Sequence, residues 1–276
     1  MDSGYSRGVA NRGTTGRGGG RAWPTGLLYS TYEQRLLSSL DRGRLPKHVA
    51  IMADGNRRWA RLNDPDGPLV SGYEAGEAKL LEFVSWCDEV GIEVVTLWVL
   101  SPDNLSRPPE EVMPLLDVIV HLVKTLAGRG QWPVQIVGDL SLLPTDLAAQ
   151  LRAAAASTDG RRGMHINVAV SYGGRRELRD AFRSLLADEA KKGTTLEELA
   201  ETIEIDTIEQ HLYTAGQPDP DLIIRTSGEQ RVSDFLIWQS AHSEFYFCEA
   251  LWPDFRRVDF LRAMRSFTQR ERRFGQ

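Results

Sequence analysis

Sulfur and imidazole side chains are scarce in this sequence. Its 276 residues include two cysteines, Cys87 and Cys248, and five histidines, all far apart along the chain. No C-x-x-C pair and no Cys/His spacing of a zinc site occurs, so neither a disulfide framework nor a structural zinc site is indicated. Unpaired cysteines fit a reducing compartment, and we therefore expect a cytoplasmic protein.

An excess of positive charge is also missing. The chain has 33 Lys and Arg against 38 Asp and Glu, a formal net charge of -5. General nucleic-acid binders need a broad basic surface, so we expect no nucleic-acid partner, and any anion site must be local. The nucleotide-binding patterns G-x-x-x-x-G-K-[ST] and G-x-G-x-x-G are absent as well, which disfavours nucleotide hydrolases and dehydrogenases.

The N-terminal part of the chain differs in composition from the rest. Residues 1–22 are rich in Gly and Arg and contain no apolar run long enough for a signal peptide or a membrane span. We expect a disordered tail there, with at most peripheral contact to a membrane. Residues 23–45 carry leucines near helical spacing and predict an amphipathic segment that packs on a catalytic domain at residues 46–276.

Short apolar runs alternate with helical patterns from residue 48 onward. Strands are predicted at residues 49–52, 94–100, 134–137, 165–170, 222–224 and 235–238, and helices at 74–90, 109–126, 175–187 and 258–272. Such alternation is typical of βα units, and continuously apolar strands are typical of buried parallel sheets. The sequence therefore predicts a single α/β domain with a central, mostly parallel six-stranded sheet flanked by helices.

The predicted helix at residues 109–126 has an unusually wide apolar surface. A helix that only covers a sheet needs a narrower apolar stripe. Two explanations remain open at this point. Either this helix is buried on two sides, or part of its surface lines an apolar tunnel for a substrate tail.

Two groups of phosphate-binding side chains follow two predicted strands. The first group is Asp54-Gly55-Asn56-Arg57-Arg58-Trp59, and the second lies within residues 225–233, which include Arg225, Arg231 and Ser233. A helix N-terminus with a glycine accommodates an anion, Arg donates to phosphate oxygens, and Asp is a hard ligand for Mg²⁺. Because ligands bind at the carboxyl ends of strands in α/β sheets, two such sites suggest a reaction that joins two phosphorylated substrates.

Further motifs follow in a recognisable order. They are His48 to Asn56, Leu100-Ser101 with Asn104 and Arg107-Pro108, Tyr172-Gly173-Gly174-Arg175, Ile224 to Glu229, and Leu251-Trp252-Pro253-Asp254-Phe255. Together they resemble the cis-prenyltransferases over residues 46–275, and several spaced motifs are more specific than one. Within that family the chain most resembles the short-chain Z-farnesyl diphosphate synthases, through residues 54–59 and 219–231.

The resemblance implies a homodimeric, Mg²⁺-dependent enzyme. It would condense isopentenyl diphosphate with a short allylic diphosphate, geranyl diphosphate in our interpretation, to a Z-prenyl product such as (2Z,6E)-farnesyl diphosphate. Asp54 would hold Mg²⁺, with Glu244 near the shared metal. The resemblance also implies an isopentenyl diphosphate site at Arg225, Arg231 and Ser233, and a tail motif, Arg273-Phe274-Gly275, that reaches the partner subunit.

The remaining implied roles concern the allylic substrate and the proton. Gly55, Asn56 and Arg58 would bind the allylic diphosphate with help from Arg107, while Ser101 and Asn104 occupy positions associated with proton loss, for which the departing diphosphate is an alternative base. The other residues expected at the substrate are Arg57, Trp59, Tyr73 and Val99.

Some residues depart from the long-chain members of the family. Arg57 stands where those enzymes usually carry Gly, and Tyr73 stands where they have His, so a histidine proton relay is not expected. Val99 replaces a usual Ala, and its β-branched side chain would narrow the tunnel and favour a short product.

The sequence leaves three alternatives to this function open and disfavours a fourth. The chain could couple allylic diphosphates head to middle, make longer polyprenyl chains, or serve as a non-catalytic partner subunit. A trans-prenyltransferase is disfavoured because no D-D-x-x-D motif occurs.

Overall fold

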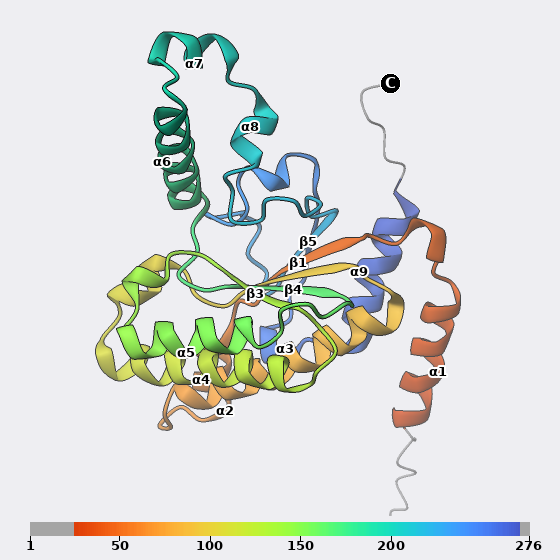
Figure 1. The fold of residues 1–276 in the computed structure, drawn as a ribbon. Coiled ribbons are helices and arrows are strands. Elements are labelled where there is room, and N and C mark those ends of the chain that lie inside the picture. The colour runs from red at the N-terminus through yellow and green to blue at the C-terminus, as the bar shows by residue number, and fades with distance from the viewer. Residues whose placement is uncertain (1–24, 271–276) are drawn as a thin grey trace, which may run out of the picture.

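The computed structural model describes residues 25–270 (Figure 1). The predictions for residues 1–22 and for the motif at residues 273–275 lie outside the described residues. Within the described part, six strands form one sheet in the order β3-β4-β2-β1-β5-β6, and each neighbouring pair is parallel. The strands are β1 (His48–Met52), β2 (Val94–Trp98), β3 (Val134–Val137), β4 (His165–Ala169), β5 (Leu222–Arg225) and β6 (Glu244–Phe247). The predicted single α/β domain with a parallel six-stranded sheet is confirmed.

Helices lie on both sides of this sheet (Figure 1). Figure 1 shows α2 to α5 stacked on one side, while α6, α7 and α8 rise from the other side. The helices are α1 (Thr25–Ser38), α2 (Asn56–Asn63), α3 (Val70–Val90), α4 (Pro109–Gly128), α5 (Thr145–Ala156), α6 (Gly174–Lys192), α7 (Leu196–Thr202), α8 (Ile205–Glu209) and α9 (Arg257–Gln269). The α1 helix packs against α9, and its Leu36 is buried in the main core.

Side chains on the two faces of β1 enter different cores. Val49 and Ile51 belong to the large core that includes residues of α3, α4, α5 and α9. Ala50 and Met52 face a smaller cluster around Tyr172. A strand that is buried on both faces has no polar face to expose, which explains the continuous apolar run in the sequence.

The α4 helix is buried on two sides, because it packs against both α3 and α5. Its wide apolar surface is thereby explained, and the substrate tunnel stays a prediction. Within residues 25–270, no helix combines the length and the apolarity that crossing a bilayer requires. The cytoplasmic location also remains a prediction.

The prediction of a strand at residues 235–238 is wrong. These residues form turns, Leu236 has a φ of 45°, and the sixth strand is β6. The apolar run is instead buried as a loop: Phe235 stacks on Trp98 with ring centroids 4.9 Å apart and contacts Tyr172 edge-on. Phe235 and Leu236 belong to the smaller core, so this loop needs the same apolar residues as a buried strand.

Candidate active site

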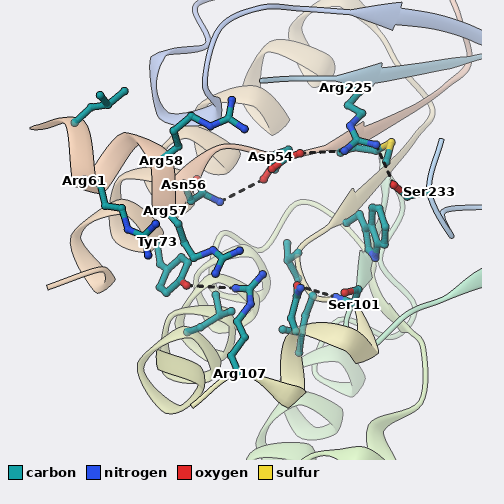
Figure 2. A pocket seen from close by; sticks show the side chains of 18 residues that line it. Asp54, Asn56, Arg57, Arg58, Arg61, Tyr73, Ser101, Arg107, Arg225 and Ser233 are labelled. Carbon is teal, nitrogen blue, oxygen red and sulfur yellow. Dashed lines mark hydrogen bonds and ion pairs between the residues drawn. The ribbon is translucent and has the colours of Figure 1, made fainter. Parts of the chain in front are cut away.

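A cavity of about 510 Å³ opens where β1, β2 and β5 end (Figure 2). Eleven of the predicted site residues line it: Asp54, Asn56, Arg57, Arg58, Tyr73, Val99, Ser101, Asn104, Arg107, Arg225 and Ser233. The order β2-β1-β5 places three strand ends side by side, so segments distant in sequence meet there. The cavity lies at the carboxyl ends of the strands, where α/β sheets bind ligands.

Asp54 and Arg225 face one another in this cavity (Figure 2). Arg225 Nη2 lies 3.1 Å from Asp54 Oδ2, and Nη1 donates to Ser233 Oγ at 3.0 Å and to the Arg231 carbonyl. The Arg225 side chain is 5% exposed, whereas that of Asp54 is 43% exposed. A buried guanidinium with fixed partners forms a rigid cation beside an accessible carboxylate.

The loop after β5 is strained and holds an unmatched donor. Ser227 and Ser233 have φ values of 73° and 55°, a region that non-glycine residues seldom adopt. Arg225 Nε is buried without an acceptor among the described residues. Backbone strain and orphaned donors cluster at functional sites, and an anion could satisfy this one.

The Asp54 backbone is fixed from two directions. Thr226 Oγ1 donates to the Asp54 carbonyl at 2.7 Å, and the Trp252 amide donates to the same oxygen at 3.0 Å. Gly55 follows with a φ of 113°, and a Cβ there would lie 2.9 Å from the Leu251 side chain. Only glycine suits this position, which turns the chain from β1 into α2.

The α2 helix brings arginines to the cavity wall. Arg57, Arg58 and Arg61 all line the cavity. The helix lies close to α3, since a Cβ on Gly72 would come within 2.2 Å of the Asn56 carbonyl. This close packing sets the direction of α2, so that its first turn points along the cavity rim.

Glu111 gathers donors on the opposite wall. Its Oε1 accepts from Tyr73 at 2.8 Å, from Arg107 Nη1 at 3.1 Å and from Arg57 Nη1 at 3.4 Å. Burial, followed by the hydrogen bond to Glu111, raises the pKa of Tyr73 to about 12. Tyr73 is therefore protonated at neutral pH and acts as a donor.

Ser101 and Asn104 lie together at the end of β2. Asn104 Oδ1 accepts from the backbone N–H of Ser101 at 3.2 Å, and the backbone N–H of Asn104 donates to the Ser101 carbonyl at 3.1 Å. Both side chains line the cavity, and Figure 2 shows Ser101 on the side of Arg107. The first bond fixes the Asn104 carboxamide in the cavity wall, and the second joins the backbones of the two residues.

Four predicted residues do not line the cavity. Gly55 lies against Leu251, and the indole of Trp59 donates to Asp254 Oδ1 at 2.8 Å. The Arg231 guanidinium pairs with Glu229 at 2.5 Å. Glu244 pairs with Arg270 and stands opposite Leu222 at the start of β5, roughly 10 Å along the sheet from Arg225 at 3.3 Å per residue. Within one subunit the structure does not bring Glu244 to Asp54.

Two residues of the site were missed in the sequence. Arg61 lies four positions after Arg57, and Glu111 lies four positions after Arg107. Arg57 and Arg61 share one face of α2, so this spacing could have indicated Arg61, whereas Arg107 precedes α4 and no helical spacing relates it to Glu111. The contact of Glu111 with Tyr73, 38 positions away, is visible only in the fold.

The donor set fits Mg²⁺ that arrives with a diphosphate. No group of three or more His, Cys, Asp or Glu side chains gathers as a metal site within residues 25–270. Mg²⁺ is commonly bound through one or two carboxylates together with substrate phosphates and waters. Asp54 is an accessible carboxylate in a cavity lined by Arg57, Arg58 and Arg225, which attract such phosphates.

A second, apolar cavity of about 30 Å³ continues from the first between α3 and α4. The two cavities share Ala53, Asn56, Tyr73, Val99 and Leu115. Its inner walls are formed by Gly76, Glu77 and Leu80 of α3 and by Val118, Ile119 and Leu122 of α4. A polar mouth that narrows into a mainly apolar extension suits a ligand with a charged head and a hydrocarbon tail.

Comparisons with known proteins agree with this arrangement. The family model described as putative undecaprenyl diphosphate synthase matches residues 51–275. A solved structure, lavandulyl diphosphate synthase from Lavandula x intermedia in complex with dimethylallyl diphosphate, is 35% identical with a TM-score of 0.77, over 85% of this chain and 100% of that chain. The chain belongs to this family of cis-prenyltransferases and is an isoprenyl diphosphate synthase.

Among the relatives, short-chain enzymes are prominent. The chain is 57% identical to (2Z,6E)-farnesyl diphosphate synthase from Thermobifida fusca over 90% of its own length and 97% of that protein. It is 51% identical to short-chain Z-isoprenyl diphosphate synthase from Mycobacterium leprae over 90% and 95% of the two chains. The predicted family and the predicted short-chain Z-prenyl transfer are confirmed.

Proposed function

We propose that this enzyme condenses isopentenyl diphosphate with geranyl diphosphate and releases (2Z,6E)-farnesyl diphosphate. The observation that carries this proposal is the polar cavity lined by Arg57, Arg58 and Arg225, which continues into a small, mainly apolar extension between α3 and α4. The names of the similar short-chain enzymes support the same reaction.

The allylic diphosphate binds at the start of α2. Free backbone N–H groups and the helix dipole favour an anion there, and Gly55 allows close approach. Asn56 and Arg58 lie on this helix, and Arg57 and Arg107 face the same space from the Glu111 side. Guanidiniums near the bridging oxygen stabilise the charge that develops as diphosphate leaves the allylic carbon.

Isopentenyl diphosphate binds beside Arg225. This guanidinium is buried, Ser233 lies 3.0 Å from it, and its Nε has no acceptor among the described residues. Arg231 is close in the same loop and would exchange Glu229 for the diphosphate. Mg²⁺, held by Asp54, would supply charge neutralisation to the leaving diphosphate.

Once the new carbon–carbon bond has formed, the positive charge lies on C3 of the former isopentenyl unit, and loss of a proton from its C2 gives the Z double bond. Ser101 and Asn104 lie in the cavity wall and are our candidates for positioning the group that takes this proton, with the departing diphosphate as the alternative base. Tyr73 is excluded as a base at neutral pH because its pKa is raised to about 12 by burial and by Glu111.

The enzyme acts as a homodimer. Phe182 and Leu186 are exposed one turn apart on α6, and Phe247 is exposed on β6, an edge strand of the sheet. Exposed apolar patches of this kind favour burial against another protein surface. A role for Glu244 at the metal then requires the second subunit, because Glu244 lies away from Asp54 in its own chain.

Incubation with each allylic diphosphate tests the reaction. The purified chain is supplied with Mg²⁺, isopentenyl diphosphate and dimethylallyl, geranyl or farnesyl diphosphate in turn, and product length and double-bond geometry are resolved. We expect (2Z,6E)-farnesyl diphosphate from geranyl diphosphate and none with the Asp54→Ala variant. Inactivity of the chain alone would indicate a partner subunit, branched products would indicate head-to-middle coupling, and long polyprenyl products would refute the short-chain assignment.

A further inference from the structure

The apolar cavity between α3 and α4 contains an unexpected carboxylate. Of the residues that line this cavity, Glu77 alone carries a carboxylate, among Leu80, Val118, Ile119 and Leu122. It lies on α3 one turn after Tyr73, which both cavities share, and one turn before Leu80, so it lines the second cavity beyond its mouth. Acidic side chains are seldom buried in apolar surroundings without a partner.

The partner of Glu77 is a histidine of the neighbouring helix. Glu77 is 9% exposed, and its Oε1 lies 2.5 Å from His121 Nδ1 on α4. The His121 side chain is 70% exposed, so it anchors the carboxylate from the solvent side. The pair spans the α3–α4 interface and holds a polar group in the cavity wall beyond the mouth.

A growing hydrocarbon tail would therefore meet two different obstacles. Val99 lies at the junction of the two cavities and narrows the path sterically. Beyond it, an additional isoprene unit would press apolar carbons against the Glu77 carboxylate and remove water from it. Removing a polar or charged group from water without new hydrogen bonds is unfavourable.

We propose that Glu77, anchored by His121, is a specificity-determining residue that stops chain growth by its polarity. This inference rests on the proposed function, because it requires the tail of the product to enter the apolar cavity. It assigns the short product to a polar stop in the cavity wall in addition to the steric effect of Val99.

The test compares Glu77→Leu with Glu77→Gln and with a matched control, Glu74→Leu. Leucine removes the polarity at similar size, whereas glutamine keeps a polar group that can bond His121. Glu74 is exposed on the same helix and does not line the cavity. Each full-length variant is incubated with Mg²⁺, isopentenyl diphosphate and geranyl diphosphate, its fold is checked by circular dichroism, and products are resolved by length.

We expect Glu77→Leu to raise the ratio of the next longer product to the wild-type product by about tenfold or more. Glu77→Gln and Glu74→Leu should keep the wild-type ratio. A folded, active Glu77→Leu enzyme with unchanged products would overturn the polar stop while leaving the proposed reaction intact, and so would an equal shift in Glu77→Gln. If Glu77→Leu does not fold, Glu77→Met serves the same comparison. Absence of any prenyl product from the wild-type chain would overturn both proposals.

Discussion

Acid should destabilise this protein through one buried imidazole, His48 at the start of β1. His48 is 1% exposed. Its Nδ1–H donates to the Pro218 carbonyl at 2.7 Å, and its Nε2 accepts from the Thr96 hydroxyl at 2.8 Å. Burial lowers the pKa of His48 from 6.5 to about 4, against the smaller opposing effects of the Pro218 hydrogen bond and of Asp221. The folded protein therefore keeps this imidazole neutral.

The sign of the pH effect follows from proton counting. Between pH 6.5 and 4 the unfolded chain binds a proton at His48 that the folded chain does not, so the free energy of unfolding falls as pH falls. The contribution of neutral His48 is fully present above pH 6.5. With these pKa values the loss is about 2 kcal/mol at pH 5 and about 3 kcal/mol at pH 4.

Urea unfolding followed by tryptophan fluorescence measures this loss. Wild type and His48→Gln are compared at pH 7 and at pH 5, at one protein concentration, because many carboxylates titrate over the same range and affect both proteins alike. The wild type should lose about 2 kcal/mol more than the variant between the two pH values. Equal losses in the two proteins would refute the assignment of a depressed pKa to His48.

Three further predictions concern the site. Glu111→Gln should raise the KM for the allylic diphosphate about tenfold, because a neutral amide holds the Tyr73 hydroxyl and the nearby guanidiniums less firmly than a carboxylate. Steady-state kinetics would show this increase in KM, with Tm unchanged. Arg225→Lys should lower kcat/KM by roughly 10²-fold because a lysine cannot bond Asp54 and Ser233 together, and near-wild-type kinetics would contradict this role. Val99→Ala should lengthen the product, and an unchanged chain-length profile would count against a steric role.

Burial explains which elements were predictable from the sequence. The runs at residues 49–52 and 222–224 are strands as expected, because these strands are buried on both faces of the sheet and their side chains must be apolar. The run at residues 235–238 has the same character but is a loop that covers the smaller core, and composition alone does not distinguish the two. The α5 helix was missed because its alanines give only a weak apolar stripe, with Leu147, Ala148 and Leu151 buried.

The site residues that follow strands could be predicted from the sequence. Those that depend on contacts between distant segments could not. Asp54 and Arg225 follow β1 and end β5, and strand order β1-β5 makes them neighbours. Glu111 and Glu77 act through partners on other helices, Tyr73 and His121, whose positions no local pattern specifies. The position of Glu244 depends on the register of β6, which the sequence leaves open.

The pairing of charges explains how a cavity with many arginines stays folded before substrate arrives. Arg225 is held by Asp54, Arg107 and Arg57 by Glu111, and Arg58 lies 3.8 Å from Glu229. These carboxylates offset the repulsion between guanidiniums and hold the donors along the cavity wall, so we expect little reorganisation when an anion binds. The two ends of the cavity differ in exposure, since the side chain of Arg225 is 5% exposed and that of Arg58 is 54% exposed. Charge interactions are stronger away from water, so we expect Arg225 at the buried end of the cavity to attract a bound diphosphate more strongly than Arg58 at the exposed end.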